Sequence, residues 1–572
     1  MTVSKTDKKV TVERDVPAMM RDGTVLRADV YRPDAPGKFP VLLQRTPYSK
    51  SREPHEEQGH RFAERGYVVV QQDVRGRHAS DGEFLPGFYS AEHRDSEDGY
   101  DTVEWAAALP WSTGKVGTFG GSYNGWTQWE LAHTRPPHLA AMIPTAIAAD
   151  LLDREMSGVL RLGRVLWWSI NTLAPDVRRR FGDESGPVTT EEAGELYLDR
   201  DRSKWLWYLP LMEIPDEVLS GVGRHWRRWL QDHAFDHFGF LEKHSRVSVP
   251  ALTTTGWYDQ QIGAIKHFTG MRKNGMTEEA RNGQRLIVGP WSHTTDFSSS
   301  RVGAMDFGPE AVQDFFQIAD DWFGRWLKGE NTGVNDWPPV QLFVMGSNRW
   351  RGENEWPLSR TRYTNYYLHS GGEANTPGGD GFLGSEQPAD EPVDSYIYDP
   401  RDPVMTLYTP PGQQEPQDQR VLAGRQDVLV YQTPPLDEPV EVTGQVTVKL
   451  WASSSARDTD FVVKLMDVRS DGFVQELCYG IVRARYRESF DGPSLIEPGR
   501  PYEYTIQVNP TSNLFQRGHR IRVDVSSSDF PNFDRNHNTG GDDYSETTLV
   551  TAHQTVFHDG QRPSRVVLPV IP

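Results

Sequence analysis

Ser122 is the strongest candidate for a catalytic side chain in the sequence. It lies in the run of residues 116–125, where an apolar strand pattern is followed by two glycines, the serine and then a helical pattern. Small residues beside a serine let the backbone turn sharply between a strand and a helix, which lifts the hydroxyl above the sheet. The usual spacing is G-x-S-x-G, but here the second glycine, Gly125, comes one place later. The run therefore indicates a nucleophilic serine, and the alternative is a glycine-rich turn without chemistry.

A nucleophilic serine needs a base, and the base needs a carboxylate that orients it. In open α/β sheets both residues are expected after the serine, each just past a strand and in the order Ser, Asp, His. The strand pattern of residues 251–255 leads to Asp259, and that of residues 286–288 leads through a Gly-Pro turn to His293. Because all three residues stand at the carboxyl ends of expected strands, we predict a triad of Ser122, Asp259 and His293.

Two other motifs point to different chemistry but are incomplete. His233 and His237 are four residues apart, which places them on one helix face, as zinc ligands can be. The general-base glutamate of the metallopeptidase motif is missing, and no third ligand stands out nearby. Residues 73–77 follow a strand but lack the glycines and the lysine of a phosphate loop. We therefore expect no metal and no cofactor, and we expect the two histidines to make structural hydrogen bonds.

The elements that must position these residues alternate between strands and helices. Short, almost wholly apolar runs are typical of parallel strands covered on both faces, and they occur at residues 41–43, 67–70, 116–119, 251–254 and 286–288. Helical patterns include residues 60–65 and 96–108, and residues 10–32 predict a β-hairpin. This order predicts an α/β domain with a parallel sheet.

Two further regions differ from this domain in composition. Residues 150–240 are helical and aromatic, so we expect them to form a cap inserted into the sheet domain, with tryptophans Trp167, Trp168, Trp205, Trp207, Trp226 and Trp229. After residue 350, a Gly-, Pro- and Asp-rich stretch (371–394) precedes strand patterns typical of a jelly-roll β-sandwich, at residues 440–451, 461–468, 502–508, 521–526 and 551–558. The predicted divisions are α/β domain 1–145 and 241–350, helical cap 146–240, and jelly roll 351–572.

The composition narrows the classes of partner. The 572 residues include 61 Lys and Arg against 80 Asp and Glu, which gives a formal net charge of -19. Such a surface repels polyanions, so we expect no nucleic-acid partner and no membrane partner, and we interpret Arg178-Arg179-Arg180 as a solvated helix end. The single Cys478 excludes an intrachain disulfide and suits a reducing compartment. Because residues 1–13 carry no secretory signal and no run approaches the ~20 apolar residues of a membrane span, the expected location is the cytoplasm.

The motifs together resemble those of a known family. They are similar to motifs of the bacterial cocaine esterase group, which includes α-amino-acid ester hydrolases, cephalosporin acylases and Xaa-Pro dipeptidyl peptidases. The matching stretches are Gly120-x-Ser122-Tyr123-x-Gly125, Gly256-Trp257-Tyr258-Asp259 and Gly289-Pro290-Trp291-Ser292-His293. The late glycine belongs to this family's own turn. The resemblance covers nearly the whole chain and implies an α/β-hydrolase sheet domain, an inserted helical cap and a C-terminal jelly roll.

The resemblance also implies roles for individual residues. By similarity, Ser122 is the nucleophile, His293 the base and Asp259 its partner. In this family a tyrosine in an R-x-P-Y stretch donates one hydrogen bond to the oxyanion, and this tyrosine maps onto Tyr48. The second donor is the backbone N–H after the serine, here that of Tyr123.

We therefore predict a serine hydrolase that cleaves small-molecule carboxylic esters through an acyl-enzyme. The alternatives within the same chemistry are an Xaa-Pro dipeptidyl peptidase, an α-amino-acid ester hydrolase and a β-lactam acylase. The alternative from another class is a non-catalytic carbohydrate-binding or scaffold protein. A homodimer is the candidate assembly.

One departure from the family pattern concerns the acyl group. In the α-amino-acid ester hydrolases, the residues two and three places after the catalytic aspartate are acidic and help to hold the substrate's α-ammonium group. This chain has Gln261 and Ile262 at those places, so a buried ammonium would lose water without gaining an ion pair. We therefore expect neutral acyl groups, unless a cap carboxylate such as Glu155 or Asp236 reaches the same space.

Overall fold

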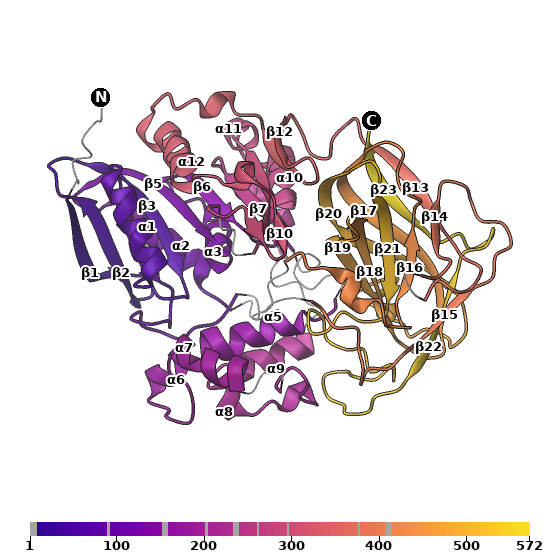
Figure 1. Ribbon diagram of the computed structural model, residues 1–572. Coiled ribbons are helices and arrows are strands. Elements are labelled where there is room, and N and C mark those ends of the chain that lie inside the picture. Colours follow the sequence, from indigo (N-terminus) through magenta and orange to yellow (C-terminus); the bar gives the residue numbers. More distant parts are fainter. Residues whose placement is uncertain are drawn as a thin grey trace.

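The structure is a computed structural model, shown in Figure 1. It describes residues 9–87, 92–150, 158–200, 204–232, 239–259, 262–293, 297–375, 378–407 and 415–572. The N-terminal sheet and its helices lie on one side, the C-terminal β-rich domain lies on the other, and a group of helices lies below the gap between them (Figure 1). No helix in these ranges is long and apolar enough to cross a membrane.

The first domain is built on a ten-stranded sheet. In spatial order its strands are β1 (Val10–Met19), β2 (Val25–Pro33), β4 (Val68–Asp73), β3 (Phe39–Thr46), β5 (Ser112–Gly121), β6 (Leu139–Thr145), β7 (Leu252–Tyr258), β8 (Arg285–Ser292), β11 (Val340–Val344) and β12 (Arg349–Glu353). The expected hairpin is confirmed as the antiparallel pair β1–β2. In this spatial order, every neighbouring pair from β4 to β11 is parallel, as the apolar runs of β3, β4, β5, β7 and β8 predict.

The main helices of this domain are α1 (Glu53–Glu64), α2 (Asp95–Ala107), α3 (Tyr123–Ala132), α10 (Ala264–Asn274), α11 (Glu278–Asn282) and α12 (Phe315–Phe323). The helices expected at residues 60–65 and 96–108 are present as α1 and α2. Apolar side chains join them to the sheet, as in the edge-to-face contact of Phe62 on α1 with Phe119 on β5, whose ring centroids are 5.3 Å apart. Because the central strands are parallel, their carboxyl ends lie along one edge of the sheet.

The expected helical insertion lies between β6 and β7. Its elements are α5 (Leu162–Trp167), the π-helix η1 (Trp168–Leu173), α6 (Ala174–Phe181), α7 (Thr190–Gly194), η2 (Glu195–Arg200), η3 (Leu211–Glu213), α8 (Asp216–Leu219) and α9 (Gly223–Asp232). The 3₁₀ turn η4 (Leu241–Arg246) follows. The interpretation of Arg178 as solvated is wrong, because its side chain is fully buried and donates to the carbonyls of Pro187 and Glu217.

The C-terminal domain is the expected β-rich fold. Its strands are β13 (Arg362–His369), β14 (Phe382–Gly384), β15 (Asp394–Tyr398), β16 (Leu429–Gln432), β17 (Val440–Ser454), β18 (Asp460–Val468), β19 (Val474–Arg483), β20 (Tyr502–Phe515), β21 (Arg520–Ser526), β22 (Ala552–Phe557) and β23 (Arg565–Ile571). All five strands expected from residue 440 onward are present, as β17, β18, β20, β21 and β22. Two details differ: the border expected after residue 350 falls inside β12, and β14 lies within the expected linker.

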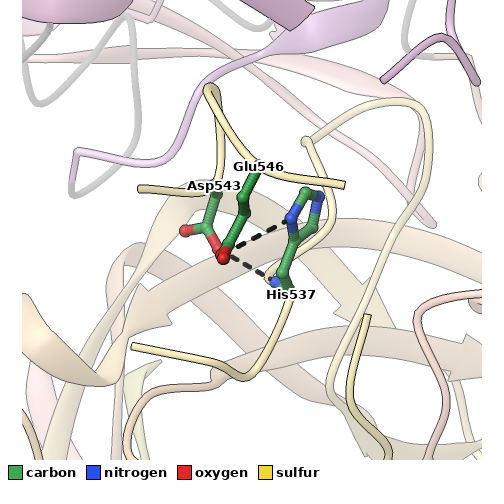
Figure 2. Close-up of side chains that lie close together, drawn as sticks. All are labelled: His537, Asp543 and Glu546. Carbon is green, nitrogen blue, oxygen red and sulfur yellow. Dashed lines mark hydrogen bonds and ion pairs between the residues drawn. The ribbon is translucent and has the colours of Figure 1, made fainter. Parts of the chain in front are cut away.

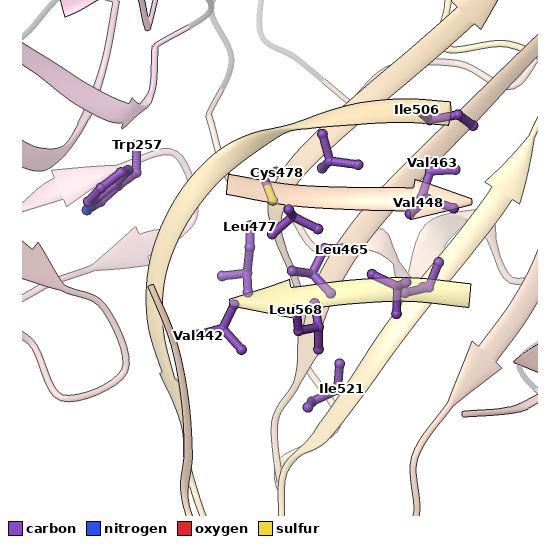
Figure 3. Close-up of a cluster of buried hydrophobic side chains, with 14 of the residues drawn as sticks. Trp257, Val442, Val448, Val463, Leu465, Leu477, Cys478, Ile506, Ile521 and Leu568 are labelled. Carbon is purple, nitrogen blue, oxygen red and sulfur yellow. The ribbon is translucent and has the colours of Figure 1, made fainter. Parts of the chain in front are cut away.

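The core of this domain contains the only cysteine of the chain. Cys478 is fully buried next to Leu465 and Leu477 (Figure 3). Burial raises the pKa of its thiol well above the ordinary value. The residue therefore acts as a small apolar side chain. The same apolar cluster reaches Trp257 at the end of β7, so it joins the two domains near the strand that leads to Asp259.

Candidate active site

Ser122 occupies the turn between β5 and α3. Its φ of 58° and ψ of -127° lie in a region that residues other than glycine rarely adopt. Gly125 follows in the first turn of α3, where an added Cβ would lie 2.9 Å from the carbonyl oxygen of Thr145. The helix thus begins directly against the end of β6, and this contact requires the glycine at position 125. The late glycine of the motif has a steric cause.

The three predicted triad residues come together at the carboxyl edge of the sheet. Asp259 follows β7 and His293 follows β8. His293 Nδ1 lies 2.8 Å from Asp259 Oδ1, and its Nε2 lies 3.0 Å from Ser122 Oγ. The Asp259 carboxylate is fully buried and also accepts a hydrogen bond of 3.2 Å from the Thr255 hydroxyl.

This geometry assigns a direction to each hydrogen bond. Because the Asp259 carboxylate accepts, His293 Nδ1 carries the hydrogen, which leaves Nε2 to accept the proton of the Ser122 hydroxyl. The buried carboxylate would face an imidazolium formed at this position. The arrangement can therefore activate Ser122 as a nucleophile toward an acyl carbon.

The two predicted oxyanion donors stand in different relations to the serine. Tyr48 follows β3 and lines the same cavity as Ser122 and His293. Tyr123 is the first residue of α3, where backbone amides point out of the helix end. Its side chain is buried elsewhere: the phenol donates a 2.8 Å hydrogen bond to Asp95 Oδ2, and burial raises its pKa well above the ordinary value. Only its backbone fits the predicted role.

The cap and the sheet domain enclose a cavity of about 1560 Å³ around Ser122. Of the six cap tryptophans, Trp167, Trp168 and Trp229 line it. The Trp168 ring stacks on Tyr123 at a centroid distance of 6.1 Å. The cap therefore places aromatic surface directly over the turn that carries the serine.

Sequence reasoning missed the cationic side chains of this cavity. Arg161 and Arg164 both line it, and Arg164 Nη2 lies 3.4 Å from His293 Nε2. These arginines belong to a short apolar stretch at the start of α5, where the sequence pattern indicates only a packed cap helix. Their contact partners come from far along the chain, so no local signal could identify them.

His55, at the start of α1, supports the loop that carries Tyr48. Its side chain is buried, and its Nδ1 lies 2.7 Å from the carbonyl oxygen of Ser49, to which it donates. Burial lowers the pKa of His55 to about 4. The imidazole is therefore neutral at neutral pH.

We expect the His55→Gln variant to lose less stability in acid than the wild type. In the unfolded chain a histidine titrates near ~6.5, so between that pH and about 4 the unfolded state binds a proton that the folded state excludes. The free energy of unfolding thus falls as the pH falls through this window. Between pH 6.5 and 5 this one group accounts for about 2 kcal/mol. Denaturant unfolding of both proteins at several pH values in this window, with pH 8 as the baseline, measures the difference. If both proteins lose the same free energy of unfolding, a neutral buried His55 is contradicted.

Possible metal ligands occur at two places in the sequence. His233 and His237 lie outside the described residues. Within the described ranges, His537, Asp543 and Glu546 bring possible ligand atoms within 4.8 Å of one another (Figure 2).

Both oxygens of the Asp543 carboxylate already have partners. Oδ1 accepts from the backbone N–H of His537 at 3.0 Å, and Oδ2 faces the guanidinium groups of Arg483 and Arg485 at 3.3 and 3.4 Å. The same two arginines also bind Asp458, Asp460 and Asp534, so this carboxylate belongs to an extended ion-pair network. The cluster fits a structural network of the C-terminal domain better than a metal centre.

Comparisons with known proteins agree with the fold. A family model described as X-Pro dipeptidyl-peptidase (S15 family) matches residues 22–295, and a model of the X-Pro dipeptidyl-peptidase C-terminal non-catalytic domain matches residues 332–567. The chain is 40% identical to the cocaine esterase of Rhodococcus sp. (strain MB1 Bresler), over 99% of each chain.

Two solved structures are similar over the whole length. An aminopeptidase from a marine sediment Thaumarchaeota archaeon has a TM-score of 0.83 at 26% identity, covering 100% of this chain and 98% of its own. An α-amino acid ester hydrolase has a TM-score of 0.79 at 25% identity, with the same coverage. The chain therefore belongs to the X-Pro dipeptidyl-peptidase (S15) family, as a serine hydrolase that cleaves carboxylic esters.

Proposed function

We propose that Ser122, His293 and Asp259 form the catalytic triad of this esterase. The observation that carries the proposal is the continuous hydrogen-bonded chain from the Asp259 carboxylate through His293 to the Ser122 hydroxyl. Ser122 Oγ attacks the ester carbonyl carbon while its proton passes to His293 Nε2. The imidazolium returns that proton to the departing alcohol, which leaves an acyl-enzyme. Water, activated by the same imidazole, then releases the acid.

The negative charge that develops on the carbonyl oxygen needs hydrogen-bond donors. We assign this role to the Tyr48 hydroxyl and the Tyr123 backbone N–H. Tyr48 supports the assignment by lining the cavity beside Ser122, and Tyr123 by standing at the amino end of α3. The helix dipole adds a partial positive charge at the same place.

A fluorophosphonate probe tests the reaction class. An activated serine is labelled rapidly, whereas a scaffold or carbohydrate-binding protein is not. Labelling should require Ser122, and a digest of the labelled protein should place the adduct on that residue. Absence of labelling in folded protein would contradict the proposal. An Xaa-Pro p-nitroanilide assayed beside a simple ester distinguishes the peptidase alternative.

The acyl pocket is proposed to prefer neutral groups. Ile262 is buried in the apolar cluster near Trp257, so it offers no counter-charge to an ammonium group. Gln261, Glu155 and Asp236 lie outside the described residues. On the described wall, Arg164 brings positive charge to within 3.4 Å of His293 Nε2. A substrate ammonium there would meet like charge after losing water, which opposes binding.

The methyl ester of phenylacetate should therefore be hydrolysed with at least tenfold higher kcat/KM than that of phenylglycine. The two acyl groups differ by the ammonium, which is present at about pH 6. Methyl mandelate is the matched control, because a neutral hydroxyl replaces the ammonium at similar size. It should behave like phenylacetate. A clear preference for phenylglycine would place this enzyme functionally with the α-amino-acid ester hydrolases.

We also propose that the enzyme works in the cytoplasm without a nucleic-acid partner. The net charge of -19 and the single cysteine support this proposal. The homodimer stays a prediction.

A further inference from the structure

The loop of residues 46–50, which carries Tyr48, is held by β4 and the segment after it. At one end, the carbonyl of Thr46 accepts a 3.0 Å hydrogen bond from the backbone N–H of Val74. At the other end, the N–H of Lys50 donates to Asp73 Oδ1 at 2.7 Å. We call residues 46–50 the oxyanion loop. Between these two ends, Pro47 has no N–H to donate, so only its carbonyl can form a backbone hydrogen bond.

Arg77 supplies that support from a fully buried position. Its Nε donates to the Pro47 carbonyl at 3.0 Å, and His78 Nε2 lies 3.1 Å from the same oxygen. The chain reaches this position through Gly76, which has a φ of +69° and lies so close to Phe84 that an added Cβ would be 2.1 Å from its backbone nitrogen. The tight turn directs the next side chain inward, under the oxyanion loop.

The other end of the Arg77 guanidinium binds the cap. Nη1 donates to the Leu173 carbonyl at 3.0 Å, and Nη2 donates to the Thr172 carbonyl at 3.1 Å. Both carbonyls lie at the end of η1, the π-helix that begins with Trp168. Asp176 completes the group, with Oδ2 at 3.5 Å from Arg77 Nε. Although burial opposes its ionisation, Arg77 and His78 hold the pKa of Asp176 below its usual range.

We propose that Arg77 is a positioning residue for ester hydrolysis, which aims the Tyr48 hydroxyl by fixing Pro47 and couples that loop to η1 of the cap. The inference rests on the proposed role of Tyr48 as an oxyanion donor. One planar guanidinium binds three carbonyls from two parts of the protein, a geometry that an ammonium group cannot reproduce. Loss of alignment at a reacting centre costs rate steeply, up to about 100-fold for a shift near 1 Å.

The test is a double-mutant cycle of Arg77→Lys and Tyr48→Phe. Lysine keeps the positive charge but lacks the planar guanidinium that binds the three carbonyls. In the wild-type background, Arg77→Lys should lower kcat for a small ester by at least tenfold, with KM changed less than threefold. In the Tyr48→Phe background the same change should cost less than threefold, because no hydroxyl remains to be aimed. A general structural defect would lower kcat equally in both backgrounds.

Arg178 provides the matched control. It is also fully buried, and its partners all belong to the cap: the carbonyls of Pro187 and Glu217 and the Asp183 carboxylate, whose Oδ2 lies 3.8 Å from Arg178 Nε. Arg178→Lys should lower the thermal midpoint without a kcat loss that depends on Tyr48. If Arg77→Lys does not fold, His78→Ala removes the other contact of the Pro47 oxygen and enters the same cycle.

The outcomes separate the two proposals. An unchanged kcat, or equal losses in both backgrounds, overturns the role of Arg77 while Tyr48→Phe alone still reports on the oxyanion donor. If Tyr48→Phe alone leaves kcat unchanged, the proposed donor itself is wrong, and so is the inference built on it. If Arg77→Lys lowers kcat in the wild-type background and not in the Tyr48→Phe background, the result supports both proposals.

Discussion

Replacing Ser122 by alanine should lower kcat by roughly four or more orders of magnitude while the protein stays folded. The change removes one oxygen atom, and the methyl group of alanine occupies the same turn. Without the nucleophile, the acyl-enzyme cannot form, and only the oxyanion donors and substrate binding still assist water. Initial rates with phenylacetate methyl ester, together with a thermal melt, measure both parts of this expectation.

The same experiment on His293 tests the triad as a unit. His293→Ala should cost about as much as Ser122→Ala, and the double variant should cost little more, because residues that act together in one step are not additive. Ser347 is the control, because it does not line the cavity. Its hydroxyl donates a 2.9 Å hydrogen bond to the Val344 carbonyl. Its change to alanine should leave kcat unchanged. Esterase activity retained in a clean Ser122→Ala preparation would refute the mechanism.

Tyr48→Phe is expected to give the second largest effect, a loss of about 2–4 kcal/mol in transition-state stabilisation, or roughly 30- to 1000-fold in kcat. The aromatic ring remains, so its packing against the cavity wall is preserved. Only the hydroxyl that we propose as an oxyanion donor is removed. Because this hydrogen bond strengthens in the transition state, the loss should appear in kcat and leave KM nearly unchanged.

Tyr67 offers a matched phenol outside the cavity. Its hydroxyl donates to Asp320 Oδ1 at 2.9 Å, away from the lining of the active-site cavity. Tyr67→Phe should therefore cost some stability with no loss of kcat. A change in KM alone for Tyr48→Phe would make Tyr48 a substrate-binding residue and would exclude it as an oxyanion donor.

Much of the fold could be predicted because its strands carry strong local patterns. The apolar runs of β3, β4, β5, β7 and β8 identify a parallel sheet without knowledge of the strand order. β6 was not predicted, because its sequence gives a weak strand signal. Three of its seven residues are small or polar, and one is a proline. β14 was hidden in a Gly- and Pro-rich stretch, where pairing with β13 overrides local propensity.

The candidate site divides in the same way. Ser122, Asp259 and His293 were predictable because each follows a recognisable strand and their order along the chain is constrained. Arg77 and Arg164 were not, because their importance lies in contacts across 96 and 129 residues of sequence. A local pattern carries no information about such partners. The sequence therefore indicates the candidate reacting groups more readily than the side chains that position them or line the substrate cavity.

The cap is inserted at the pairing of β6 with β7, which we call the joint. This position affects how readily caps can change between related enzymes. Thr145 and Thr254 pair as neighbours in the sheet, with their hydroxyl oxygens 2.7 Å apart, although 109 positions separate them along the chain. The entropy lost on closing a loop grows only logarithmically, at about 0.6 kcal/mol for each doubling of its length. The sheet is thus nearly indifferent to the size of the segment looped out between these threonines. We therefore expect that whole caps can be exchanged at this joint during evolution or in designed chimaeras. On the proposed role of Arg77, the new segment would again have to offer it two carbonyls.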